Sequence, residues 1–197
     1  MRCVTIAVNG QSMCVAGISD ALMIGPSIGG AVFDEYPPTL EIRGMCELDT
    51  NRTAHIYWCE NLQLKLGHCV RFSFVESQEP SPPIEIVPTD SPEYIEEQRK
   101  FEELEKSFVP DRTPMRRTWP NLTFECRVNG EPVANARFTE QEEHILCTVH
   151  WDKWRSERCR VYVRSFGDKS KPEDSVATEW FRTNLALGDV FEVRLAA

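Results

Sequence analysis

The chain contains the phrase Leu-x-Leu-Gly twice, at residues 64–67 and 185–188, and an alternating apolar segment follows each copy. Two further landmarks recur in the same order, namely Val-Asn-Gly at 8–10 and 128–130, and Trp at 58 and 180. The three pairs are separated by 120 to 122 residues. A nearly constant offset over three landmarks indicates an internal duplication, so this chain of 197 residues is expected to fold as two related halves.

Each half carries the signals of short β-strands. Both Asn-Gly pairs lie between alternating apolar segments, and both residue types tolerate the positive φ that a tight hairpin requires. Residues 70–74 and 191–195 alternate between apolar and polar side chains, as expected for strands with one buried face. Residues 39–44 and 159–166 show the same alternation and are predicted to be strands.

Residues 21–32 and 142–151 form the least clear pair. Gly25 and Pro26 disfavour a helix in the first copy, whereas Thr139-x-x-Glu142 could cap a helix in the second. If the two halves share one fold, both segments are strands. Each half then has about five short strands.

The predicted fold class is therefore mainly β. It consists of two duplicated, small β-sandwich or barrel-like modules at 1–77 and 118–197, joined by a proline-rich connector at 78–117. Tandem β-grasp modules, each with a hairpin, a helix and further strands, are the alternative.

The connector contains one predicted helix, at about 92–108. Ser91 is a suitable N-cap, and Pro92 suits the first helical position. One face of this helix carries an apolar stripe, namely Tyr94, Phe101, Leu104 and Phe108. A free helix of this length is marginal in water, so we expect the stripe either to dock on a β module or to bind a partner.

Charge and composition narrow the class of protein. A net charge of −9 without a strongly basic block argues against direct nucleic-acid binding. No segment has the roughly 18 consecutive apolar residues of a membrane span, and Asn9 and Gly10 interrupt the first apolar run, unlike a secretory signal. We therefore expect a cytoplasmic protein whose eight cysteines are reduced and mostly buried.

Catalytic motifs are missing from the sequence. It has no glycine-rich phosphate loop, no CxxC pair and no nucleophile elbow. His55 with Cys59, and Cys147 with His150, are the nearest Cys–His pairs, but in strands their side chains need not converge. We expect no catalytic residue, no cofactor and no metal site.

The segment VHWDKWRSERCR (149–160) is the candidate interaction surface, because Trp and Arg are enriched at binding hot spots. Its candidate contact residues are Trp151, Lys153, Trp154, Arg155 and Arg158. The competing interpretation is an ordinary hairpin turn in which one Trp is part of the core.

The first half of the chain resembles a group of short uncharacterised bacterial proteins. The resemblance rests on the Val-Asn-Gly hairpin, the segments LEIRG, HIYW and LKLGHCVRFSFVES, and the charged helix. The resemblance covers roughly the first 108 residues, and this chain has Gly67-His68 where that group usually has Gly-Asp. It implies no activity, ligand or catalytic residue.

The functional expectation is a non-enzymatic bacterial protein-binding module pair with a protein partner, possible roles being toxin neutralisation or accessory work in a defence system. The oligomeric state is left open. A tandem ubiquitin-like modifier is the first alternative, although the chain lacks a terminal Gly-Gly. An enzyme that uses Cys and His is the second.

Overall fold

The computed structural model describes the chain except residues 33–37, 108–118, 120, 139–141 and 168–176. The described part contains strands β1 to β13, the helix α1 (Pro92–Ser107) and a short 3-10 helix, η1 (Lys153–Arg155). The strands are β1 (Arg2–Val8), β2 (Gln11–Ala16), β3 (Ala21–Ala31), β4 (Thr39–Asp49), β5 (Arg52–Gln63), β6 (Cys69–Glu76), β7 (Glu85–Pro88), β8 (Thr123–Val128), β9 (Glu131–Arg137), β10 (Glu142–Asp152), β11 (Cys159–Gly167), β12 (Thr178–Leu185) and β13 (Val190–Ala196). The mainly β fold class is confirmed.

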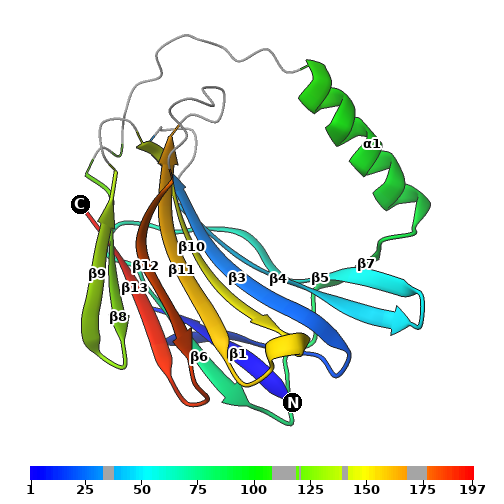
Figure 1. Cartoon of the computed structure of the whole chain (residues 1–197), viewed down its shortest axis with the longest axis horizontal. Helices are drawn as coiled ribbons and strands as arrows, with labels where there is room; N and C mark the ends of the chain where they lie inside the picture. Colours follow the sequence, from blue (N-terminus) through cyan, green and yellow to red (C-terminus); the bar gives the residue numbers. More distant parts are fainter. Residues whose placement is uncertain (33–37, 108–118, 120, 139–141, 168–176) are drawn as a thin grey trace.

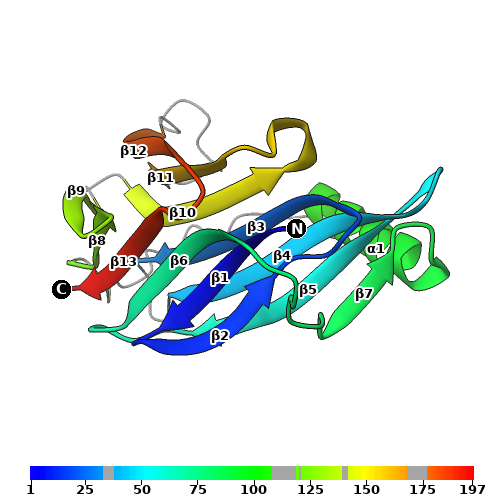
Figure 2. The same cartoon turned by 90° about the horizontal axis from the view of Figure 1, so that it is seen from below.

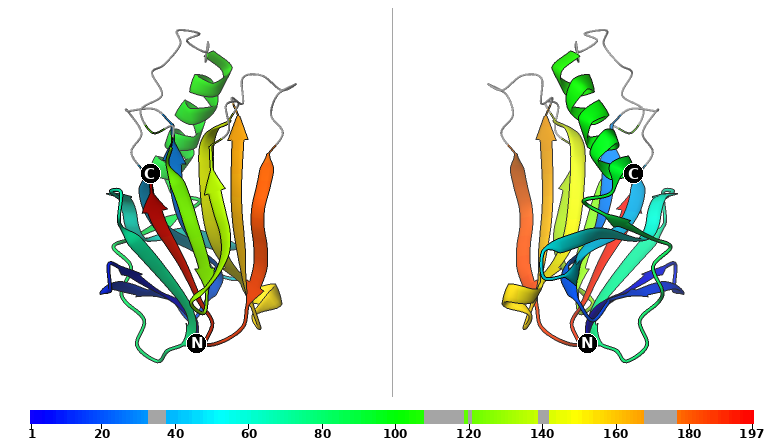
Figure 3. Two further views of the ribbon diagram at one scale, coloured as in Figure 1. Left: turned by 90° about the vertical axis from the view of Figure 1, so that its left-hand side faces the viewer. Right: turned by 90° about the vertical axis from the view of Figure 1, so that its right-hand side faces the viewer.

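The strands form two facing antiparallel sheets (Figures 1 and 3). Sheet A has the order β2-β1-β6-β13-β8-β9, and sheet B has the order β12-β11-β10-β3-β4-β5-β7. The strands β1 to β6 of the first half correspond to β8 to β13 of the second half, seven labels later. Apart from β7, each sheet therefore lists the strands of one half followed by their counterparts in the reverse order. Each half thus contributes three strands to each sheet, and β7 extends sheet B.

The two halves share one core. β6 pairs with β13 in sheet A, and β3 pairs with β10 in sheet B, so both sheets run across the boundary between the halves. The buried apolar side chains of both halves form a single cluster, with Phe72 and Phe191 stacked across the junction at 6.3 Å between ring centroids. The sequence predicts that each half folds as a separate module. In the structure, β6 pairs with β13 and β3 pairs with β10, so the inward side chains of the two halves are buried together.

The two predicted hairpins are present. Asn9 and Gly10 connect β1 to β2 with φ of 52° and 78°, and Asn129 and Gly130 connect β8 to β9 with φ of 51° and 87°. Two consecutive positive φ values are typical of the tight turns that match the twist of antiparallel strands.

The unclear pair of segments forms strands in both halves, β3 and β10, which lie side by side. Thr139, the possible helix cap, lies outside the described residues. Pro26 pairs with Ile42 of β4, but no register partner on β10 faces Gly25 or Pro26. A proline has no amide hydrogen to donate, which explains why the ladder is interrupted at this point.

The connector adds β7 and α1 to the edge of sheet B. Ser91 accepts a hydrogen bond from the Tyr94 amide at 3.2 Å, so the predicted N-cap is confirmed. The helix contains no buried residue. In the predicted stripe, Tyr94 contacts His55 of the sandwich, whereas Phe101 and Leu104 are exposed. Phe108 lies outside the described residues. In the described part of the chain, no helix is long and apolar enough to cross a membrane.

Candidate interaction surface

The candidate residues of the sequence lie at the tip of the β10–β11 hairpin, where η1 forms the turn. Trp151 is the last inward-facing residue of β10 and is only 7% exposed. Its Nε1 donates a hydrogen bond to the Ser156 carbonyl at 3.1 Å. Trp151 therefore fixes the turn from inside and does not belong to the accessible surface.

Trp154 has the opposite environment, since 72% of it is exposed. The Nζ of Lys153 lies 5.6 Å from the Trp154 ring centroid and 2.5 Å from the Glu47 carboxylate on β4. This ion pair ties the tip to the neighbouring hairpin. Arg155 and Arg158 are exposed beside it, and neither forms an ion pair with any described residue. Four of the five predicted residues thus form one exposed aromatic and basic cluster, the hairpin tip.

The Cys–His pairs of the sequence are separated in the structure. Cys147 is buried in the core, whereas His150 lies on the outer face of sheet B. Burial raises the pKa of the Cys147 thiol well above its ordinary value. On β5, the thiol of Cys59 donates to the Leu40 carbonyl, while His55 lies 3.1 Å from the Tyr94 hydroxyl. Neither thiol has a histidine as its base.

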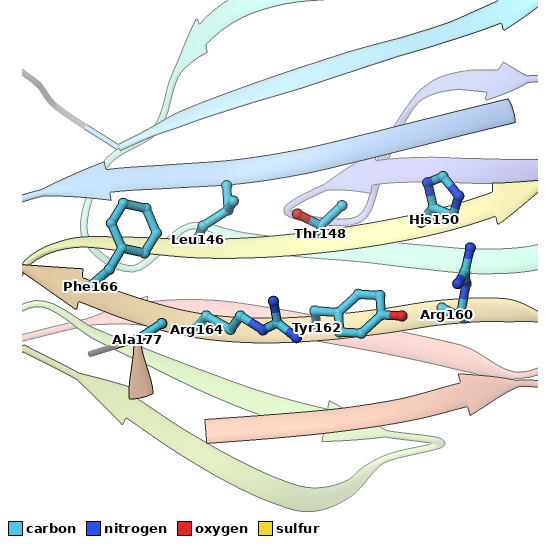
Figure 4. A pocket seen from close by; sticks show the side chains of 8 residues that line it. All are labelled: Leu146, Thr148, His150, Arg160, Tyr162, Arg164, Phe166 and Ala177. Atoms are coloured by element: carbon cyan, nitrogen blue, oxygen red, sulfur yellow. The ribbon is translucent and has the colours of Figure 1, made fainter. Parts of the chain in front are cut away.

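The outer face of sheet B contains a second feature that the sequence did not predict, a hollow of about 510 Å³ (Figure 4). Its side chains alternate with the buried residues of β10 and β11, so they all point away from the core. They include Leu146, Thr148 and His150 of β10 and Arg160, Tyr162, Arg164 and Phe166 of β11. The only signal in the sequence is that β11 places two aromatic and two basic residues at its outward positions.

Cations gather around one ring in this hollow. The guanidinium carbons of Arg164 and Arg182 lie 5.1 and 5.3 Å from the ring centroid of Tyr162. Arg164 also pairs with Glu179 at 2.8 Å. Arg182 forms no ion pair with any described residue, so its charge is available to a ligand.

The other end of the hollow holds a balanced charge cluster. Arg160 pairs with the buried carboxylate of Asp152 at 2.6 Å, and His150 lies 3.6 Å from the same carboxylate. Burial and the Arg160 charge lower the pKa of His150, against the opposing effect of Asp152. The lowered pKa favours the neutral form of His150.

A second hollow, of about 440 Å³, adjoins the first one and shares Leu146 and Phe166 with it. It extends across Gly29 and Gly30 of β3 toward Gln63 of β5. A Cβ at Gly29 would meet open space, so this glycine leaves the outer face of β3 without a side chain and deepens the surface. Together the two hollows give the outer face of sheet B a continuous depression with apolar and basic walls.

No group of three or more His, Cys, Asp or Glu side chains within the described ranges is placed to hold a metal ion. Comparison with known proteins identifies no matching family model, no matching curated protein and no matching solved structure.

Proposed function

We propose that the protein is a non-enzymatic bacterial protein-binding protein of the cytoplasm, and that the hairpin tip is its contact with a protein partner. The observation that carries the proposal is the exposure of Trp154 on a turn that is itself held in place. A tryptophan in contact with water is unfavourable for the isolated chain, whereas Trp and Arg are the residues that contribute most at protein interfaces.

The support of the tip lowers the entropic cost of binding. Trp151 anchors the turn from the core, and Lys153 links it to Glu47, so the Trp154 backbone is ordered before a partner arrives. The unpaired charges of Arg155 and Arg158 favour an acidic rim on the partner. The proposed partner therefore has an apolar pocket for one indole ring, surrounded by carboxylates.

The cellular role within this proposal is to neutralise a toxin or to assist a defence system by occupying a partner's surface. An acidic protein that binds through a small basic tip would select a partner by local charge rather than by net charge.

Affinity capture from the native host tests the proposal. The wild-type chain is expected to retain one protein in stoichiometric amount, and Trp154→Ala is expected to weaken that binding by roughly tenfold to a hundredfold. Leu187→Ala is the matched control, since Leu187 is also exposed but lies in the β12–β13 turn. Thermal unfolding of both variants checks that the fold is retained.

The proposal fails if Trp154→Ala retains the partner as well as the wild-type chain does. It also fails if no protein binds stoichiometrically while the purified chain turns over a substrate in broad hydrolase screens.

We also infer that the two halves arose by internal duplication. The mirrored strand orders of the sheets and the matching left-handed Asn-Gly turns support this origin. The hairpin tip belongs to the second half alone, so the binding role proposed for it is a property that the halves do not share.

A further inference from the structure

The helix α1 is uncovered in the isolated chain. Its first turn contacts sheet B where the Tyr94 hydroxyl meets His55, and the rest of the helix projects beyond the sheets (Figures 1 and 3). Phe101 is 57% exposed and Leu104 is 66% exposed. A lone helix of 16 residues is marginal in water, so a covering surface would stabilise it.

One face of α1 combines apolar and acidic side chains. Successive residues on this side of the helix are three or four positions apart, which places them on one face. They are Tyr94, Glu97, Phe101 and then both Leu104 and Glu105. We call this side the acidic face. Neither of its two glutamates forms an ion pair with any described residue.

The cations of α1 lie elsewhere on the helix. Arg99 pairs with Glu96 and with Glu103, each at 2.8 Å, and Lys100 also approaches Glu96. These ion pairs neutralise Arg99 and Lys100 on other sides of the helix, so they do not neutralise the glutamates of the acidic face. A partner for that face must therefore supply both apolar surface and positive charge.

The hollow of sheet B has this complementary chemistry. Its apolar side chains include Leu146, Tyr162 and Phe166 (Figure 4). The guanidinium groups of Arg164 and Arg182 lie near the Tyr162 ring. An amphipathic helix in an apolar groove, with opposite charges at the margins, is a common mode of recognition.

The helix and the hollow lie on the same face of the molecule but at opposite ends of sheet B. His55, which contacts α1, faces outward between the buried residues Ala54 and Ile56 of β5, whereas the hollow lies on β10 and β11. Figure 2 shows α1 beside β5 and β7, with β12 at the far end of the sheet. In its own chain, the acidic face is not docked on the hollow.

In two copies related by a two-fold axis parallel to the strands, the acidic face of one copy can reach the hollow of the other. The axis exchanges the two ends of sheet B and turns the outer faces toward each other. Each helix then lies over the hollow of the other copy, and the contact closes on itself, as in most homodimers.

We propose that the protein forms a symmetric homodimer in which the acidic face of α1 docks in the hollow of a second copy. Phe101 and Leu104 contact Tyr162 and Leu146, while Glu97 and Glu105 face the arginines beside Tyr162. The surface is separate from the hairpin tip, so either proposal can fail without the other.

Sedimentation equilibrium of the full chain, from micromolar to hundreds of micromolar concentration, tests the proposal. The wild-type chain is expected to dimerise, and Phe101→Asp with Leu104→Asp is expected to weaken the dimer by roughly a hundredfold. Ile95→Asp is the matched control, because Ile95 is 57% exposed on a different face of the same helix and its replacement should leave the dimer intact.

A charge exchange tests the pairing itself. Glu97→Arg with Glu105→Arg is expected to dissociate the dimer, and so is Arg164→Glu with Arg182→Glu. Combining all four substitutions in one chain should restore dimerisation, which a merely structural effect of either pair would not do.

The proposal is overturned if the wild-type chain stays monomeric throughout, whether its helix is then free or folded onto its own sheet. It is equally overturned if a dimer forms but the helix substitutions and the arginine substitutions leave its affinity unchanged.

Discussion

The backbone amide of Gly67 donates a hydrogen bond of 2.7 Å to the carbonyl oxygen of Leu195, in the last strand of the other half. The reciprocal bond joins the amide of Gly188 to the carbonyl of Phe74 at 2.8 Å. Each Leu-x-Leu-Gly phrase thus ends in a turn that is fastened to the opposite half. The repeated phrase therefore has a structural role at the junction of the two halves.

Replacing either glycine by alanine is expected to destabilise the junction. Gly67 and Gly188 have φ of 86° and 92°, and an added Cβ meets no atom within 4 Å at either position, so the cost comes from the backbone alone. The free energy of unfolding should fall by about 1–2 kcal/mol in each variant, as measured by urea denaturation. Leu66→Ala, an exposed neighbour, is the control. Equal stability of Gly67→Ala and the wild-type chain would contradict this role.

The shared core predicts that the chain unfolds in one cooperative transition. Phe72 and Phe191 are register partners across β6 and β13, and both are fully buried. Phe72→Ala and Phe191→Ala should each lower the free energy of unfolding by about 3–5 kcal/mol. The double variant should lose less than the sum, because the two rings contact one another. The shared core would be disproved if scanning calorimetry showed two unfolding transitions and each Phe→Ala substitution shifted the midpoint temperature of only one of them.

Two glycines of sheet B are expected to respond in opposite ways to an added methyl group. A Cβ at Gly44 would lie 2.5 Å from the Met23 carbonyl oxygen and 3.3 Å from the Trp58 ring. Gly44→Ala should therefore cost about 1–3 kcal/mol. At Gly29 the Cβ has open space, so Gly29→Ala should be neutral or stabilise the strand by about 0.5–1 kcal/mol. Guanidinium denaturation of the two variants checks the difference, and a loss of stability in both would refute it.

The buried thiols should be inert in the native protein. Burial raises the pKa of Cys14, Cys126 and Cys159 to about 12, so almost no thiolate exists at pH 8. Iodoacetamide labelling followed by peptide mapping should modify the partly exposed Cys59 and Cys69 first. The three buried cysteines should react only after denaturant is added. Their rapid labelling in the folded chain would show that the core opens.

The stability of the protein should decrease as the solution becomes mildly acidic. The pKa of His150 is lowered by burial and by Arg160, so the unfolded chain binds more protons than the folded chain below about pH 6.5. The free energy of unfolding is then highest above that pH and falls as the pH drops toward the lowered pKa. His150→Gln should flatten the curve between pH 7.5 and pH 5.5. An unchanged slope in this variant would assign the effect to other groups, such as His55, whose pKa is also lowered by burial.

The sequence by itself determined the local structure. The Asn-Gly turns, the alternating strands and the N-cap at Ser91 depend on residues that are neighbours in the chain, and the backbone preferences of those residues are the same in any fold. The mainly β class follows from the same signals. The exposed cluster at the hairpin tip was also predictable by residue type, because Trp and three cations occur within one short segment.

Only the tertiary structure decided how the strands pair and which side chains meet. Alternation shows that one face of β6 is buried, but it does not show that β6 pairs with β13, since any strand of the right length could occupy that place. The same limit applies to Trp151 and Trp154, whose different exposures depend on where β10 ends and η1 begins. It applies to the hollow as well, because Arg182 reaches Tyr162 only through the register between β12 and β11.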